Sequence, residues 1–199
     1  MIISHDEKFV FVRNPKTATR SITDLLKNNV RVFECSDHHY WIIPEHCKNY
    51  FIFVFVRNPF TRCVSAYKHI MTDMKKKGHN IFDFEEFISR KHIGVGTNTM
   101  PVKNVFLQTT FINMVKKDSN IQNIKICKYE NLSAEIKSMK FLKNINIPKI
   151  GESEDRDSWM NLYTPKVAQK LTEVASVDFE NFGYSKNIND YNFTNRLLL

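Results

Sequence analysis

The sequence lacks a long hydrophobic run. Its longest apolar stretch extends from Tyr50 to Val56 in a chain of 199 residues, whereas a membrane-spanning helix needs about 20 apolar residues. The first residues, MIISHDEKFVFVRNP, also lack the basic start and the extended apolar segment of a signal peptide. We therefore expect a chain that is made and kept in the cytoplasm and has no membrane partner.

Close cysteine pairs and flexible linkers are also missing. The four cysteines show no close pairing along the sequence, which agrees with a reducing compartment. No tract rich in Gly, Ser or Pro divides the chain, and 42% of its residues are apolar. That content is enough for one domain with a substantial core. We predict a single domain over residues 1–199.

Positive charge is in excess, with a net charge of +8. A basic protein suits an anionic partner, such as nucleic acid, a phosphorylated cofactor or an acidic polymer. The run Lys75-Lys76-Lys77 is more simply interpreted as a solvated helix face. The charge alone does not select among these partners.

Apolar runs that can form buried strands alternate with helical patterns. The strand candidates are residues 9–12, 30–34, 50–56 and 124–130. Five helical patterns are predicted, which begin near Thr19, after Pro59, at FDFEEFI, at Leu132 and at Pro165. Thr164 is the expected N-cap of the last one. This alternation predicts right-handed crossovers in an α/β fold, with a central parallel sheet of four or five strands flanked by helices.

One pentapeptide, Phe-Val-Arg-Asn-Pro, occurs twice, at residues 11–15 and 55–59. Both copies end a predicted strand and precede a predicted helix. Chance can explain the repeat, because such residues form strands and Asn-Pro stops them. Alternatively, both loops meet one ligand, since ligands of parallel sheets bind beyond the carboxyl ends of the strands.

The first loop, NPKTATRS, covers Asn14 to Ser21. Backbone N–H groups are unpaired at a helix N-terminus, and the helix dipole there favours an anion. Lys16 and Arg20 add positive charge, while Thr17, Thr19 and Ser21 add hydroxyl groups. The composition fits a phosphate or sulfate site, and it equally fits an ordinary capped helix with a surface lysine.

The glycines of a Walker A loop are missing from this segment. Lys16-Thr17 matches the end of that motif, but Val10 and Pro15 stand at its glycine positions. A Walker B strand should end in an Asp that organises magnesium, whereas the strongest strand ends in Arg57-Asn58. The loop therefore suits an anion without an obvious metal partner.

The second loop, RNPFTRCVSAY, places Arg57 at a strand end and Ser65 in the following helix. An Arg can hold a phosphate through two hydrogen bonds, and a nearby hydroxyl can donate to the same group. The alternative is that Arg57 pairs with a carboxylate and that Ser65 is a tolerated helix residue. Together with NPKTATRS, this loop resembles the PAPS-dependent sulfotransferases, in particular the carbohydrate sulfotransferase superfamily, where PAPS is 3′-phosphoadenosine 5′-phosphosulfate.

The resemblance continues through NIFDFEEFI, ICKYENL and VASVDFENFGY, and it covers about residues 9–184. It implies a P-loop-NTPase-like fold and PAPS as the sulfuryl donor, with no metal. It also implies that Lys16, the catalytic cation, contacts the 5′-phosphosulfate, surrounded by donors from Thr17, Ala18, Thr19, Arg20 and Ser21. Arg57 and Ser65 would hold the 3′-phosphate. Arg13 is given no role.

The resemblance also calls for a base near the acceptor hydroxyl. The segment CSDHHYW offers His39 first and His38 second, with Asp37 as a partner or as the base itself. Both histidines can equally be ordinary surface residues. Cys35, His38, His39, His46 and Cys47 are of metal-ligand type, but their spacing matches no common zinc pattern. We therefore expect no metal.

The predicted activity is sulfuryl transfer from PAPS to a hydroxyl acceptor, most simply a carbohydrate. Residues 94–111 are expected to line the acceptor side, with Gln108 as a candidate for binding a sugar hydroxyl. A P-loop kinase for small molecules is an alternative that the missing glycines and magnesium ligand disfavour. A basic nucleic-acid-binding module is another, but the strand YFIFVFV is too apolar for one, so no nucleic-acid partner is expected. A further alternative is a family member that binds nucleotide without catalysis.

Overall fold

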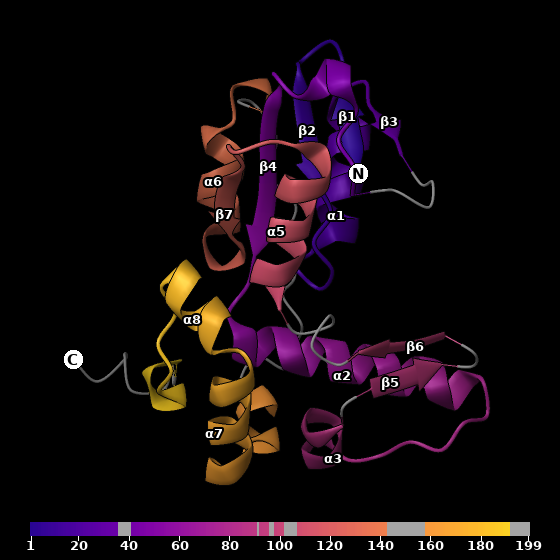
Figure 1. Ribbon diagram of the computed structural model, residues 1–199, viewed down its shortest axis with the longest axis vertical. Coiled ribbons are helices and arrows are strands. Elements are labelled where there is room, and N and C mark those ends of the chain that lie inside the picture. The colour runs from indigo at the N-terminus through magenta and orange to yellow at the C-terminus, as the bar shows by residue number, and fades with distance from the viewer. Residues whose placement is uncertain (36–40, 91, 96–97, 102–106, 143–157, 192–199) are drawn as a thin grey trace. The chain divides into compact units, whose positions relative to one another are not determined.

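The computed structural model describes residues 1–35, 41–90, 92–95, 98–101, 107–142 and 158–191 (Figure 1). The chain forms two compact units. The first unit consists of Met1–Arg57 and Thr110–Gly151, and the second consists of Asn58–Thr109 and Glu152–Leu199. The single domain predicted from the sequence stays a prediction, and each unit is described by itself.

The first unit contains a five-stranded sheet in the order β3-β1-β2-β4-β7. Its strands are β1 (Ile2–Ser4), β2 (Phe9–Val12), β3 (Phe33–Glu34), β4 (Phe51–Val56) and β7 (Lys125–Lys128). Its helices are α1 (Thr19–Asn29), most of α5 (Gln108–Ser119) and α6 (Leu132–Ser138), with short 3₁₀ turns η1 (Glu45–Cys47), η2 (Tyr129–Asn131) and η3 (Lys140–Leu142). The predicted strands at 9–12, 50–56 and 124–130 are thereby confirmed as β2, β4 and β7.

The prediction of a wholly parallel sheet is wrong. Strands β2, β4 and β7 are parallel to one another, but β1 is antiparallel to both β2 and β3. Only residues 5–8 separate β1 from β2. That is too short for a crossover, so the two strands must form a hairpin. The segment predicted as a strand at 30–34 is the short edge strand β3.

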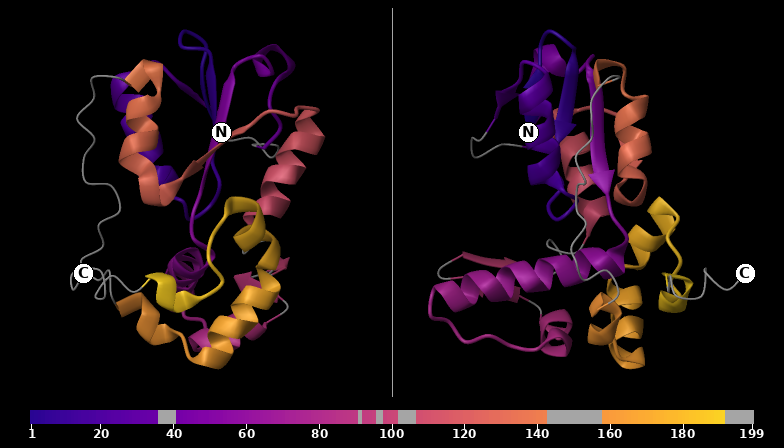
Figure 2. Two further views of the ribbon diagram at one scale, coloured as in Figure 1. Left: turned by 90° about the vertical axis from the view of Figure 1, so that its left-hand side faces the viewer. Right: turned by 180° about the vertical axis from the view of Figure 1, so that it is seen from behind.

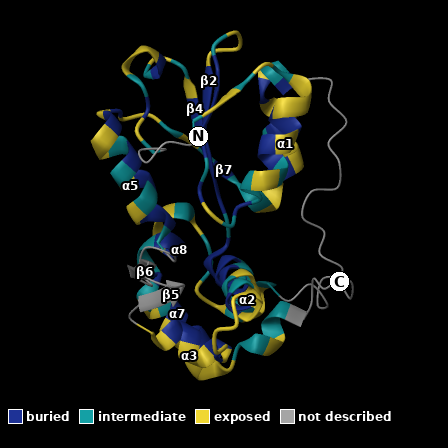
Figure 3. Ribbon diagram, turned by 90° about the vertical axis from the view of Figure 1, so that its right-hand side faces the viewer, coloured by how far each residue is buried: buried dark blue, intermediate teal, exposed yellow. Residues whose placement is uncertain are grey.

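The sheet lies between helices on both faces. Figure 2 shows α1 and α6 on one side of the strands and α5 on the other. Phe9 and Phe11 of β2 share the α1 and α6 face with Phe53 and Phe55 of β4, because alternate residues of a strand point to the same side. All four rings are buried, and the Phe11 and Phe53 rings stack with centroids 5.1 Å apart. Figure 3 shows burial concentrated along β2 and β4, with exposed residues on the outer faces of the helices.

The second unit is mainly helical. Its elements are α2 (Pro59–Lys76), α3 (Phe84–Ser89), β5 (His92–Val95), β6 (Asn98–Pro101), η4 (Ser158–Leu162), α7 (Pro165–Val174), α8 (Ser176–Phe182) and η5 (Ile188–Tyr191). Phe60 of α2 packs edge-on against Phe179 of α8 and Tyr163 in its buried core. The predicted cap at Thr164 is confirmed, since its side chain accepts from the Val167 N–H at 3.3 Å.

A buried carboxylate fixes the start of α5 in this unit. Asp178 of α8 is fully buried and accepts hydrogen bonds at 2.8 Å from the backbone N–H groups of Gln108 and Thr109. The carboxylate thus satisfies two of the N–H groups that a helix N-terminus leaves unpaired. Helix α5 itself was not predicted from the sequence.

Candidate functional site

The loop between β2 and α1 contains two residues in the left-handed backbone conformation. Lys16 has a φ of 68° and Ala18 has a φ of 58°, while Thr17 between them has a negative φ. A residue with a Cβ atom adopts this conformation at a cost of about 1–2 kcal/mol. Such strain persists only where the surroundings enforce it, and it is concentrated at ligand-binding sites. The loop is therefore a candidate functional site.

The alternation of backbone conformation at Lys16, Thr17 and Ala18 suits anion binding. Successive residues of right- and left-handed conformation turn their N–H groups toward one side and form a concave nest for an anion. Glycine usually occupies such positions, because it adopts a positive φ without steric cost. The missing Walker A glycines therefore do not prevent this chain from forming left-handed turns here.

Helix α1 begins directly after the loop. Ala18 is its N-cap residue and offers no side-chain hydrogen bond, and the first turn contains no acidic residue. Thr19 and Ser21 are half-buried in that turn, and Arg20 is exposed. The positive end of the helix dipole therefore faces the loop without a neutralising carboxylate from its own first turn.

Two buried polar side chains hold the loop in place. Asn14 donates from Nδ2 to the carbonyl of Phe55 at 2.9 Å, which ties the end of β2 to β4. Thr17 donates from Oγ1 to the carbonyl of Asn14 at 2.8 Å. Both side chains are fully buried. The Thr17 hydroxyl proton thus serves the loop itself, so any Thr17 proton for a ligand must come from its backbone N–H.

The consecutive residues from Lys16 to Ser21 form the end of the loop and the first turn of α1. Lys16 is half-buried and occupies the first left-handed position. The roles predicted for these six residues toward a 5′-phosphosulfate stay predictions. The left-handed backbone and the uncapped helix are the observations that favour them.

Arg13, in the first copy of the repeated pentapeptide, forms an ion pair with Glu34 of β3. Lys27 of α1 binds the other oxygen of the same carboxylate. Hydrogen bonds from Lys27 and then Arg13 lower the pKa of Glu34 below its ordinary value. Arg13 and Lys27 thus meet at one carboxylate, which links the end of β2 to β3 and α1. That Arg13 has no ligand role stays a prediction.

Arg57, in the second copy, lies over an aromatic ring. Its guanidinium carbon is 4.4 Å from the centroid of the Tyr129 ring, within the range of a cation–π interaction. The register explains the contact, because Val56 of β4 pairs with Lys128 of β7 and the next residues of the two strands follow side by side. Both side chains are half-buried. Tyr129 is a residue whose role the sequence did not reveal, although the segment ICKYENL carries part of the resemblance.

Ser65 lies on α2 in the second unit and is half-buried. Arg57 is the last residue of the first stretch of the other unit. The joint action of Arg57 and Ser65 on a 3′-phosphate stays a prediction. Helix α2 begins with Pro59, and the Asn58 side chain caps it by accepting from the Phe60 N–H at 2.8 Å.

The predicted bases lie outside the described residues. Asp37, His38 and His39 all fall within residues 36–40, so their role stays a prediction. Gln108, the candidate for a sugar hydroxyl, is fully buried at the start of α5. A side chain so placed reaches an acceptor only after a rearrangement of its surroundings.

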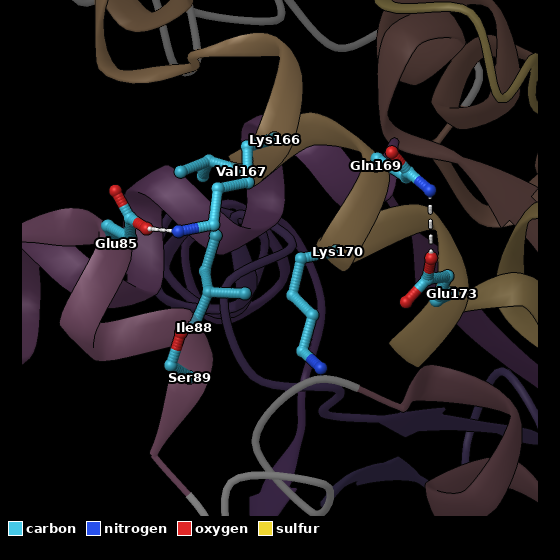
Figure 4. A pocket seen from close by; sticks show the side chains of 8 residues that line it. All are labelled: Glu85, Ile88, Ser89, Lys166, Val167, Gln169, Lys170 and Glu173. Atoms are coloured by element: carbon cyan, nitrogen blue, oxygen red, sulfur yellow. Dashed lines mark hydrogen bonds and ion pairs between the residues drawn. The ribbon is translucent and has the colours of Figure 1, made fainter.

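The second unit has a pocket of about 330 Å³ between α3 and α7 (Figure 4). Lys166 binds Glu85 across it with a separation of 2.7 Å between Nζ and Oε1, and Gln169 donates to Glu173 at 3.2 Å. Its polar groups thus pair largely with one another. None of the residues that line the pocket has the positive φ found at Lys16 and Ala18.

No helix within the described ranges combines the length and the apolar character needed to cross a bilayer. The sulfotransferase family matches the chain over residues 1–185. The match includes both copies of the pentapeptide, the Lys16 loop and the Tyr129 segment. No curated protein and no solved structure matches the chain. The chain belongs to the sulfotransferase family.

Proposed function

We propose that this sulfotransferase uses PAPS as its donor and a hydroxyl group, most simply that of a carbohydrate, as its acceptor. The observation that carries the proposal is the pair of left-handed residues, Lys16 and Ala18, directly before an uncapped helix. Family membership supplies the reaction type. The loop supplies a reason why a phosphosulfate, rather than a neutral ligand, suits this site.

Each residue of the loop has a distinct task in this proposal. The Lys16 ammonium neutralises negative charge that accumulates on the 5′-phosphate as the sulfuryl group leaves. The backbone N–H groups from Thr17 to Ser21 donate to phosphate and sulfate oxygens. Thr17 and Asn14 keep the loop in its strained shape before the ligand arrives. A preformed site of this kind needs little reorganisation during the reaction.

Arg57 is proposed to hold the 3′-phosphate together with Ser65. A planar guanidinium can donate two parallel hydrogen bonds to a phosphate. The Tyr129 ring below it limits the rotamers of Arg57 through a cation–π contact. His39, or else His38, remains the proposed base that takes the acceptor proton.

The use of PAPS as the donor can be tested most directly. The purified chain is incubated with PAPS and a panel of polysaccharides and small sugars, and release of adenosine 3′,5′-bisphosphate is measured without added magnesium. We expect release that depends on an acceptor. A parallel incubation with ATP and magnesium tests for kinase activity. Acceptor phosphorylation from ATP with no consumption of PAPS would contradict the proposal and favour the kinase alternative.

A further inference from the structure

Three side chains of metal-ligand type converge near the amino ends of β2 and β4, at the opposite end of these strands from the Lys16 loop. His5 lies in the turn between β1 and β2, and His46 and Cys47 belong to η1 before β4. One potential ligand atom from each residue lies within 4.8 Å of the other two. The sequence pattern alone could not reveal this cluster, because His5 is 41 residues before His46.

The pairing of β2 with β4 shows that this cluster is separate from the Lys16 loop. Phe9 and Phe51 pair at the amino ends of β2 and β4, whereas the Lys16 loop follows the carboxyl end of β2 at Val12. Four extended residues span about 13 Å. The cluster is thus a separate site, and its chemistry does not depend on the proposed sulfuryl transfer.

The ligand set points to a borderline-soft ion. Two imidazoles and one thiolate suit zinc better than magnesium or calcium, which prefer oxygen ligands. We propose that His5, His46 and Cys47 bind a single zinc ion, with a water molecule in the fourth position.

The environment of His5 resembles that of a histidine prepared for metal binding. Its Nδ1 lies 3.2 Å from the Tyr50 hydroxyl oxygen. Metal-binding histidines commonly use their second ring nitrogen for a hydrogen bond that fixes the tautomer and the ring orientation. With Nδ1 engaged by Tyr50, Nε2 of His5 is the ligand atom.

Binding requires only a small adjustment. Ligand atoms around a tetrahedral zinc ion are about 3.3–3.6 Å apart, given bond lengths near 2.0–2.3 Å. The three atoms of the cluster, which lie within 4.8 Å of one another, must therefore approach by up to about 1.5 Å. His46 is exposed and its ring can move, whereas Cys47 is buried. Hydrogen bonds from Cys47 N–H to the Pro44 carbonyl at 2.8 Å and from Tyr50 N–H to the Cys47 carbonyl at 3.0 Å fix the backbone around Cys47.

The thiol gives up its proton when the ion binds. Zinc takes the place of this proton, which is released to solvent, and the sulfur binds as thiolate. The ion then joins the β1–β2 turn to the segment before β4 and acts as a structural clip.

Cobalt serves as a spectroscopic probe of this site. The protein is produced without a histidine tag, stripped of metal and titrated with Co²⁺. We expect one equivalent to produce a thiolate-to-cobalt charge-transfer band and the visible bands of tetrahedral cobalt, both removed by one equivalent of Zn²⁺. Zinc at 100 times its dissociation constant should also raise the melting temperature by about 5–10 °C.

Matched variants identify the ligands. His46→Asn changes an exposed side chain, so it should fold normally and lose both the cobalt bands and the zinc-dependent melting shift. Cys47→Ser should lose the charge-transfer band. His79→Asn, an exposed histidine of the second unit, and Cys35→Ser, a half-exposed cysteine outside the cluster, should retain the signals. The proposal is overturned if one equivalent of cobalt gives no thiolate band, or if His46→Asn binds as the unchanged chain does.

Discussion

The two copies of Phe-Val-Arg-Asn-Pro end neighbouring parallel strands, yet they lead to different structures. After the first copy, the backbone turns left-handed at Lys16 and Ala18, and α1 begins without a side-chain cap. In the second copy, α2 begins at the last residue, Pro59, and Asn58 of the copy caps it. The same five residues thus end before an uncapped helix in one place and contain the capped start of a helix in the other.

The two arginines differ as well. Arg13 forms an ion pair with Glu34, whereas Arg57 lies over the Tyr129 ring. The Glu34 carboxylate neutralises Arg13, whereas the Tyr129 ring orients the Arg57 guanidinium through a cation–π contact. We therefore expect the residues around each copy, rather than the copy itself, to decide whether its arginine binds a ligand. In this account, the first copy contributes through the loop that follows it and the second through its own arginine.

Loss of the Lys16 ammonium should produce the largest effect. Lys16→Ala is expected to lower sulfuryl-transfer turnover by about 100-fold or more, because preorganised charge at a leaving group is worth that much in comparable sites. Release of adenosine 3′,5′-bisphosphate gives the rate. Lys75→Ala, an exposed lysine on α2, is the control and should leave the rate unchanged. Equal losses in the two variants would mean that the first loop has no special role.

The cap of the second helix should matter mainly for stability. Asn58→Ala removes the acceptor for the Phe60 N–H, so we expect a loss of about 1 kcal/mol in the free energy of unfolding. That corresponds to a fall of about 2–4 °C in melting temperature for a chain of this size. Differential scanning calorimetry measures it. Ala18→Ser, which adds a hydroxyl at the uncapped helix, should produce no comparable gain, because a left-handed residue lacks the extended backbone of an N-cap.

Loss of the aromatic ring beneath Arg57 should have a moderate effect on nucleotide affinity. Tyr129→Leu is expected to weaken binding of adenosine 3′,5′-bisphosphate by about 2–5-fold, because exposed cation–π contacts contribute about 0.5–1 kcal/mol. Tyr129→Phe retains the ring face and should bind as the unchanged chain does. Calorimetric titration measures both affinities. Tyr129→Leu binding with unaltered affinity would show that the ring does not position Arg57.

Loss of the ion pair between Arg13 and Glu34 should have the smallest effect, and only on stability. Glu34→Gln is expected to cost at most about 0.5 kcal/mol at pH 7, because the carboxylate is partly exposed to solvent. Hydrogen bonds from Lys27 and Arg13 lower the pKa of folded Glu34 below 4.5, its ordinary value. Its stabilisation is therefore complete above that value and is lost as the pH falls through the folded pKa.

Urea unfolding at neutral and acidic pH tests this expectation. The unchanged chain and Glu34→Gln should differ slightly at pH 7 and converge below the folded pKa of Glu34. A difference that grows as the pH falls would show that Glu34 is not a stabilised carboxylate.

Much of the central sheet was predictable from the sequence. The apolar strands β2 and β4 were recognisable because both of their faces are largely buried. The strand β7 was also predicted, although it lies at the edge of the sheet and only its Cys127 is buried. β1 was not predicted, because Ile2–Ser4 is too short to show a periodic pattern, and its hairpin with β2 made the sheet mixed. The helices α2, α3 and α7 of the second unit were predicted, but α8 was not. Helix α5, which starts in this unit and continues in the first, was also missed, and its link to α8 through Asp178 is a tertiary contact.

The candidate site was foreseen in composition but not in conformation. Lys16 and its neighbours were singled out by charge and by their place before a helix. Their left-handed backbone has no signal in the sequence, because glycine is absent at both positions. Likewise, the contacts of Arg13 with Glu34 and of Arg57 with Tyr129 depend on strand pairing over long sequence separations. Identical pentapeptides could not reveal that difference.

The most direct test of the account compares the two arginines as binders of one nucleotide. Calorimetric titration with adenosine 3′,5′-bisphosphate, without magnesium, is performed on the unchanged chain, on Arg57→Ala and on its matched control Arg13→Ala. We predict that Arg57→Ala loses affinity by at least about 10-fold, as expected when a charged hydrogen-bond donor is removed, and that Arg13→Ala binds as the unchanged chain does. If both variants bind normally, or if Arg13→Ala is the one that fails, the account of the second copy as the 3′-phosphate site is contradicted.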